Sequence, residues 1–266
     1  APADLLRLAH RLLESGVLRQ GSLSKAARGY HLAQGNNERP VTRLAVLPVA
    51  AKASVEQGLE AALESALAHW LYHDEIWLRG NAKAKAEILL AIARVRHALV
   101  LFGGIVPRKA TTHLRALLND ADAVLLAADT ADEALFRTEV VGAKLALTEW
   151  LVQRGWRPFL NEAGEKKIAG SFKRFADIHL SRVAAELRSA VQHLAVEDAA
   201  DQLPKLSRDI DSVQLLAGAY GDAVAPWLEN WQELQRAIEH DDRSVFEYFR
   251  RQALAAEPFW LHSGKR

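Results

Sequence analysis

One long stretch of the sequence carries cations but no acids. From Ile88 to Asn119 there is no aspartate or glutamate, although 25% of all residues are charged. Arginine offers a planar fork of donors that can pair with two phosphate oxygens at once, and lysine adds a compact positive charge. The stretch therefore predicts a site for phosphate-rich anions. Its basic residues are Arg94, Arg96, Arg108, Lys109 and Arg115, together with His97 and His113.

Arg94 and Arg96 form the predicted centre of this site. They flank an apolar helical face around Val95, so their guanidinium groups are expected at the edge of a bundle, where charge is screened less than in open solvent. Arg108 and Lys109 are expected to converge on the same anion. The alternative is a solvated helix face whose acids lie on a neighbouring helix, and the sequence leaves both interpretations open.

A second basic segment covers residues 171–194. At helical spacing, His179, Arg182 and Glu186 share one border of its apolar stripe. This border fits an anion pocket between helices, but Glu186 could equally neutralise Arg182, which is the interpretation we favour for the trio. Arg182 and the later Arg208 are nevertheless included among the predicted anion-binding residues.

Two histidines have a spacing that suits a metal ion. His69 and His73 are four residues apart, so one helical face could present two imidazoles. A catalytic zinc ion normally has three protein ligands, and the sequence offers no matching cluster elsewhere. We therefore predict no metal site here and give the pair a structural role.

Several kinds of chemistry are excluded by what the sequence lacks. There is no cysteine, which removes thiol nucleophiles, disulfides and zinc–cysteine sites. Nucleophile-elbow, P-loop and dinucleotide-binding patterns do not occur. The acids are scattered, whereas Mg²⁺-dependent phosphate hydrolysis needs clustered carboxylates. We expect no catalytic residue and no cofactor in this chain by itself.

Charge and hydropathy limit the partners and the location. The net charge is only +1 and the pI is about 8.2, which argues against nucleic acid as a partner. No apolar run approaches the roughly 20 residues of a membrane span. Lack of cysteine is typical of a reducing compartment. We expect a cytoplasmic protein without a membrane partner.

Helical periodicity continues through most of the chain and must position these residues. Strand alternation is missing and short breaks separate segments of bundle length, which predicts an all-α fold of antiparallel helical bundles. The main body is predicted to begin with a capping box at Ser54 and Gln57. The predicted breaks are Gly80-Asn81, Gly103-Gly104 with Pro107, Asp129 to Asp132, Gly155 with Pro158, Gly164, Pro204, and Gly218 to Asp222.

Four runs of residues resemble known proteins. Residues 18–35 read Leu-Arg-Gln-Gly-Ser-Leu-Ser-Lys-Ala-Ala-Arg-Gly-Tyr-His-Leu-Ala-Gln-Gly. This run resembles the closing segment of a CYTH triphosphate-tunnel domain in its YgiF-type bacterial form, and residues 101–110, 171–182 and 257–266 resemble the CHAD region of the same proteins. The resemblance implies a CYTH tail at residues 1–35, a linker at 36–52, and at 53–266 a CHAD helical domain of two pseudo-symmetric four-helix bundles.

The resemblance also implies a parent enzyme. Such proteins hydrolyse inorganic triphosphate with Mg²⁺ or Mn²⁺ inside a β-barrel tunnel. The tunnel family's Glu-Xaa-Glu-Xaa-Lys metal motif does not occur in this chain, so the catalytic barrel is expected to be missing from it. Lys25 and Arg28 match the family's Ser-Lys-Xaa-Xaa-Arg-Gly-Tyr ending, which implies that they face triphosphate in an intact tunnel.

CHAD domains bind polyphosphate through a pattern resembling His-Xaa-Xaa-Arg-Val-Xaa-Xaa-Arg-Arg-Xaa-Arg. Arg94 and Arg96 fall on its last basic positions, whereas Ala86, Leu89 and Ala93 replace the histidine and two arginines. The resemblance therefore implies an accessory domain that binds polyphosphate or triphosphate beside an N-terminal CYTH domain.

The second bundle matches the pattern less well. Arg208 replaces a lysine of the family by charge, but acids and a proline occupy other basic positions. The alternative function is therefore a structural or oligomerisation module that stabilises the catalytic barrel, with a degenerate anion site.

Overall fold

Helices make up almost all of the regular structure. The computed structural model describes residues 2–14, 18–21, 23–35 and 39–261, except for the side chains of Pro2 and Arg28. Within these ranges there is no strand, only an isolated bridge between Ser54 and Ser171. The predicted all-α class is confirmed. No helix in the described ranges is both long enough and apolar enough to cross a membrane.

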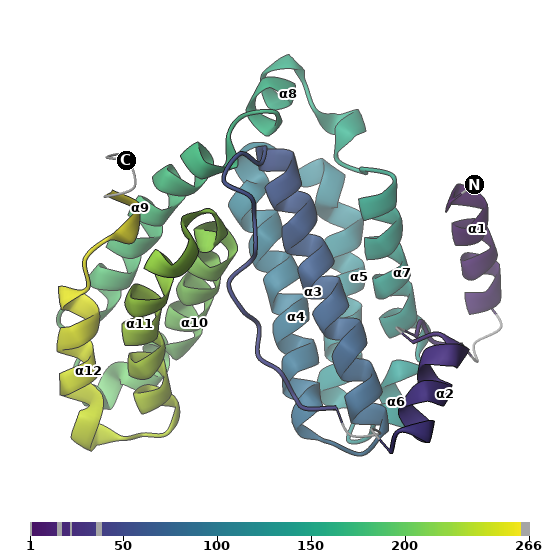
Figure 1. The fold of residues 1–266 in the computed structure, drawn as a ribbon, viewed down its shortest axis with the longest axis horizontal. Coiled ribbons are helices and arrows are strands. Elements are labelled where there is room, and N and C mark those ends of the chain that lie inside the picture. The colour runs from purple at the N-terminus through teal and green to yellow at the C-terminus, as the bar shows by residue number, and fades with distance from the viewer. Residues whose placement is uncertain (1, 15–17, 22, 36–38, 262–266) are drawn as a thin grey trace. The chain divides into compact units, whose positions relative to one another are not determined.

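The chain divides into two compact units. The first contains residues 1–44 and 62–165, and the second contains residues 45–61 and 166–266. Each unit has a bundle of its own, and each is described separately below (Figure 1). The boundaries that the resemblance implies at residues 35 and 52 stay a prediction.

Four long helices form the described bundle of the first unit. They are α3 (Val55–Leu78) from residue 62 onward, α4 (Lys83–Leu101), α5 (Arg108–Ala127) and α7 (Thr138–Val152). Helix α5 packs against both α4 and α7, and α1 packs against α7 (Figure 1). The shorter elements are α1 (Pro2–Leu13), α2 (Lys25–Ala33), η1 (Phe102–Gly104), α6 (Ala131–Leu135), η2 (Arg157–Phe159) and α8 (Glu162–Ile168), the last of which ends in the second unit.

The second unit contains another set of four long helices in its described part. They are α9 (Phe172–Val191), α10 (Ala199–Leu216), α11 (Val224–Glu239) and α12 (Arg243–Ala255). Helix α10 packs against α9 and α11, and α11 packs against α12. Phe172 and Trp231 are fully buried in its core. Short 3-10 segments complete it at η3 (Val196–Asp198), η4 (Ala217–Ala223) and η5 (Phe259–Leu261).

The local signals at helix ends mostly agree with the structure. At the start of α3, the Ser54 amide donates to Gln57 Oε1 at 2.8 Å and the Gln57 amide donates to Ser54 Oγ at 3.2 Å, so the predicted capping box is present. The predicted break at Gly80-Asn81 falls between α3 and α4. Gly103-Gly104 lie in the short 3-10 helix η1 between α4 and α5, and the break predicted at residues 129–132 is shorter than expected, because α6 already begins at Ala131.

Two predicted breaks are wrong. Helix α8 contains Gly164, whose amide donates to the Asn161 side chain at 2.9 Å, so this glycine lies in a capped first turn. Helix α10 continues through Pro204. The proline removes one amide donor, but the carbonyl left without it, four residues earlier, belongs to exposed Ala200 and can bind water.

A buried ion pair crosses the first bundle. Lys144 Nζ of α7 lies 2.5 Å from Asp74 Oδ2 of α3, and neither side chain has any exposed surface. Burial raises the pKa of the Asp74 carboxyl, while the Lys144 ammonium acts in the opposite direction. The Lys144 ammonium also lies 5.7 Å from the centre of the Trp70 ring. Neither residue was singled out from the sequence as half of a pair.

Part of the predicted linker is packed into the second unit. Leu47 is only 2% exposed, and its amide donates to the Gln214 carbonyl at 2.9 Å. The backbone of Leu47 can pack this closely because residue 218 is a glycine. A Cβ at that position would overlap the Leu47 carbonyl oxygen.

We expect Gly218→Ala to lower the free energy of unfolding by about 1–3 kcal/mol, the usual cost of an added methyl group in a filled space. Gly104→Ala is the control, because nothing lies within 4 Å of a Cβ at that position. Urea unfolding of both variants checks the prediction. Equal stability of the Gly218→Ala and Gly104→Ala variants would show that the Leu47 backbone does not pack against residue 218.

Candidate anion-binding site

The start of α5 carries the candidate site. Pro107 precedes the helix in an extended conformation, no side chain caps this end, and no acid lies in the first turn. The Trp150 indole of α7 donates to the Ala110 carbonyl at 3.1 Å, which fixes the first turn of α5 against α7. The positive end of the α5 dipole is thus open to an anion.

Arg108 and Arg115 lie two turns apart on one face of α5. A chain of hydrogen bonds links them: Arg115 Nε donates to Thr111 Oγ1 at 3.0 Å, and that hydroxyl donates to the Arg108 carbonyl at 3.0 Å. Thr111 is buried, so this link is fixed by packing. All three residues line a cavity of about 320 Å³ with Leu99, Val100, Gly103 and Val106.

Two positively charged side chains, Arg108 and Arg115, lie close together at this cavity. Burial lowers the pKa of Arg115, and the positive charge of Arg108 lowers it further. No carboxylate in the described residues forms an ion pair with either arginine. An anion that contacts both groups would replace this repulsion by attraction, and each hydrogen bond to it would be charge-assisted.

Lys109 adds a third cation at the same helix end. Its ammonium lies 5.7 Å from the centre of the Phe159 ring, at a distance typical of a cation–π contact. The predicted pair Arg108 and Lys109 therefore lies in the first turn of α5, and Arg115 lies two turns further along the same helix. The sequence signal for Arg115 and Thr111 was their spacing of seven and three residues from Arg108.

The predicted centre has different surroundings. Arg94 is 1% exposed, so the expectation that its guanidinium lies at the edge of the bundle is wrong. It follows Ala91 by three residues and precedes Ala98 by four, and both alanines are buried, which places Arg94 on the buried face of α4. The role of Arg94 in anion binding stays a prediction.

Arg96 is held by α5. Its Nη1 donates to Asp122 Oδ2 at 3.1 Å and its Nη2 donates to the Leu118 carbonyl at 3.0 Å. The acid on a neighbouring helix, which the sequence left open as an alternative, is present for this residue. Arg96 therefore ties α4 to the helix that carries the cavity.

Comparison with known proteins identifies the fold family. The family model for the CHAD domain matches residues 61–251. The chain belongs to the CHAD domain family. A crystal structure of the CHAD domain from the plant Ricinus communis is similar, with a TM-score of 0.52 and 16% sequence identity, over 82% of this chain and 91% of that chain. At this identity the likeness shows the fold alone.

In the second unit of this CHAD domain chain, both predicted arginines have acidic neighbours. Arg182 Nε lies 3.7 Å from Glu186 Oε1, which is the pairing favoured from the sequence, and Arg208 Nε lies 3.3 Å from Asp209 Oδ1. Burial lowers the pKa of His179, and Arg182 lowers it further. These arginines are thus neutralised locally, unlike Arg108 and Arg115.

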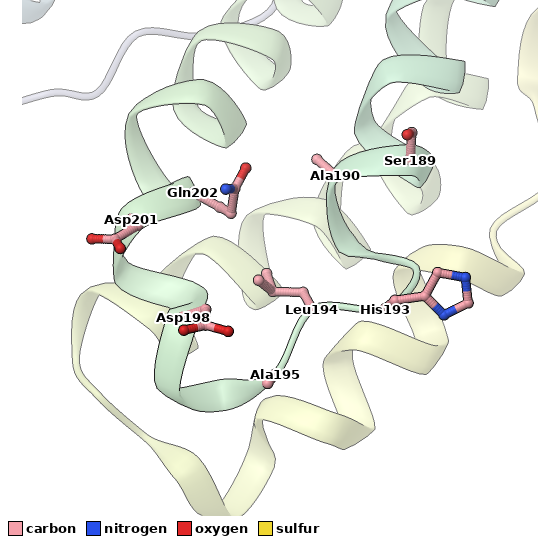
Figure 2. A pocket seen from close by; sticks show the side chains of 8 residues that line it. All are labelled: Ser189, Ala190, His193, Leu194, Ala195, Asp198, Asp201 and Gln202. Atoms are coloured by element: carbon pink, nitrogen blue, oxygen red, sulfur yellow. The ribbon is translucent and has the colours of Figure 1, made fainter.

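A cavity in the second unit is lined by acidic side chains. It has a volume of about 420 Å³ and is lined by Ser189, Ala190, His193, Leu194, Ala195, Asp198, Asp201 and Gln202. Figure 2 shows the His193 ring and the Asp201 carboxylate pointing away from each other. No lysine or arginine among the described residues lines this cavity of the CHAD domain, so it is not a candidate phosphate site.

The predicted tunnel residues lie outside the residues matched to the CHAD domain. Lys25 is exposed at the start of α2, where Ser24 Oγ accepts from the Ala27 amide at 3.1 Å. The side chain of Arg28 lies outside the described residues. Their predicted contact with triphosphate therefore stays a prediction.

In the described part of the CHAD domain, one group of side chains could hold a metal ion. His69 and His73 of α3 lie close to Glu87 of α4, and the three potential ligand atoms are within 4.8 Å of one another. Sequence reasoning missed Glu87 because the third residue belongs to the next helix.

Proposed function

We propose that this CHAD domain binds phosphate-rich anions, namely inorganic polyphosphate or triphosphate, at the start of α5. The observation that carries the proposal is the pair Arg108 and Arg115, which line one cavity without an acidic partner among the described residues. Lys109 extends the positive surface beyond the cavity. In this account Arg96 is a positioning residue, because it holds α5 through Asp122 and the Leu118 carbonyl.

A phosphate chain fits this arrangement better than a carboxylate. Guanidinium groups pair with two oxygens at a time, and each unit of a phosphate chain carries its own charge, so one chain can contact several cations. The cavity also has an apolar wall of Leu99, Val100 and Val106. Polyphosphate is preferred to a single phosphate because it can reach both arginines and Lys109.

We further propose that the domain is accessory to an inorganic triphosphatase. The support is the resemblance of residues 18–35 to the end of a CYTH domain, in which Lys25 and Arg28 match basic positions. Hydrolysis, and the Mg²⁺ or Mn²⁺ that it needs, are assigned to the N-terminal CYTH domain in a cytoplasmic bacterial protein. Within this chain we assign binding alone.

Binding of long-chain polyphosphate should weaken steeply with salt. Each neutralised phosphate on a flexible strand contributes about −0.7 to the slope of log affinity against log salt, so three cations give about −2 and a loss of roughly tenfold to twentyfold between about 50 and 200 mM. Isothermal calorimetry at several salt concentrations measures this slope. Absence of binding at the lowest ionic strength would contradict the proposal.

A structural role is the second candidate, and α1 favours it. Leu5, Leu8 and Leu12 are 70%, 53% and 47% exposed and lie on one face of this helix. A neighbouring domain such as the CYTH barrel could cover that face. If so, the barrel should unfold at a lower temperature when expressed without this chain, and changing Leu5 and Leu8 to serine in the full protein should reproduce the loss.

A further inference from the structure

Two histidines and a glutamate form a compact buried cluster in the first unit. His69 and His73 are one turn apart on α3, and their ring centres are 4.1 Å apart. His69 Nε2 lies 3.0 Å from Glu87 Oε2 of α4, and each of these two side chains is about a tenth exposed, at 10% and 11%. His73 has no exposed surface. Three potential ligand atoms therefore converge in a space largely shielded from water.

The hydrogen bonds orient the rings for coordination. His73 Nδ1 donates to the His69 carbonyl at 2.8 Å, so the lone pair of His73 is on Nε2. That lone pair accepts from the Thr42 amide at 3.2 Å. Metal-bound histidines commonly donate their second N–H to a carbonyl in this way, which fixes the tautomer and the direction of the ring.

We propose that this cluster binds a divalent transition-metal ion of the zinc class through His69 Nε2, His73 Nε2 and the Glu87 carboxylate. Imidazole nitrogens select such ions over Mg²⁺ and Mn²⁺, which favour oxygen ligands. The site is thus different in kind from the Mg²⁺ or Mn²⁺ site assigned to the tunnel. Three protein ligands leave one tetrahedral position for water.

Binding requires small movements. Metal–ligand bonds of about 2.1 Å in a tetrahedron place the ligand atoms about 3.4 Å apart. The atoms of His69 and Glu87 are already 3.0 Å apart, whereas the largest separation in the cluster reaches 4.8 Å at most. The ion takes the place of the proton shared by His69 and Glu87, which passes to solvent, and it takes the lone pair of His73 from the Thr42 amide.

Loss of the Thr42 hydrogen bond is a specific consequence. The segment around Thr42 keeps other contacts, because the Tyr72 hydroxyl donates to the Pro40 carbonyl at 3.0 Å and the Arg39 guanidinium lies 5.1 Å from the centre of the Tyr72 ring. The segment should therefore stay in place while one amide becomes free. Zinc is expected to speed hydrogen exchange at Thr42 and leave the core amides of α4 unchanged.

Metal titration of the chelator-treated chain tests the proposal. Zn²⁺ should bind with a stoichiometry of one by calorimetry, and Co²⁺ should give the visible absorption of a four-coordinate ion. Glu87→Gln and His69→Gln should each weaken binding by more than about tenfold. The control, His193→Gln, changes an exposed histidine of the second unit and should bind as the wild type does.

Several outcomes would overturn the proposal. One is a wild-type chain that binds neither ion at micromolar concentration. Another is binding that Glu87→Gln and His69→Gln leave unchanged, since the ions would then occupy surface groups. If circular dichroism shows that both variants are unfolded, the wild-type exchange measurement decides, and a Thr42 amide unaffected by Zn²⁺ would refute the site.

Discussion

Lys144→Met is expected to lower the free energy of unfolding by about 3–5 kcal/mol, the usual cost of removing one partner of a buried ion pair. The reason is that the variant leaves the buried Asp74 carboxylate without its cationic partner. Asp74 is fully buried, and its Oδ1 has no hydrogen-bond partner among the residues that the structure describes. Without Lys144, neither oxygen would have its charge compensated by a direct contact with these residues. Urea unfolding monitored by tryptophan fluorescence measures the loss, because Trp70 lies beside the pair.

Two comparisons sharpen this test. Arg137→Met removes one partner of an exposed pair with Glu139, and it should cost less than about 1 kcal/mol. Combining Lys144→Met with Asp74→Leu should recover much of the stability, because an apolar pair leaves no buried charge. A loss from Lys144→Met as small as that from Arg137→Met would show that the pair is hydrated in solution.

Changing Arg108 and Arg115 together to glutamine should have the largest effect on polyphosphate affinity. Each hydrogen-bonded contact to a charged group contributes about 1.5–3 kcal/mol, so even one lost contact weakens binding by roughly 10- to 150-fold. Glutamine keeps a polar, though shorter, side chain without the charge. Calorimetry with long-chain polyphosphate gives the ratio of affinities.

The matched control is Arg182→Gln with Arg208→Gln. It removes the same two charges from the second unit, where both arginines have acidic neighbours. Net charge falls equally in the two double variants, so a general electrostatic effect would lower both affinities alike. Equal losses would therefore contradict a localised site at the start of α5.

Local sequence signals predicted much of the fold. The Ser54–Gln57 capping box is confirmed because both hydrogen bonds form within one turn. Pro204 misled the prediction, since helix α10 tolerates one missing donor near its exposed beginning. The rule that proline ends a helix does not consider whether the carbonyl left without a donor, here that of Ala200, is exposed and can bind water.

The site was only partly predictable for a different reason. An acid-free stretch identifies a positive segment, but Asp122 lies just beyond it and reaches Arg96 from the next helix. In the same way Glu87 completes the histidine cluster from α4, and Asp74 meets Lys144 across 70 residues of sequence. Such pairings depend on how the helices pack against one another. The periodicity of residues along a single helix does not predict this packing.

A crystal structure of the chain with bound tripolyphosphate, grown without sulfate or orthophosphate, would show directly whether the anion binds at the start of α5. Phosphate oxygens are expected within hydrogen-bond distance of the Arg108 and Arg115 guanidinium groups, in the cavity beside Thr111. Lys109 should lie close to the same chain of phosphates. Tripolyphosphate bound only elsewhere, for instance at Arg182 and Arg208, with this cavity free of it, would contradict an anion site at the start of α5.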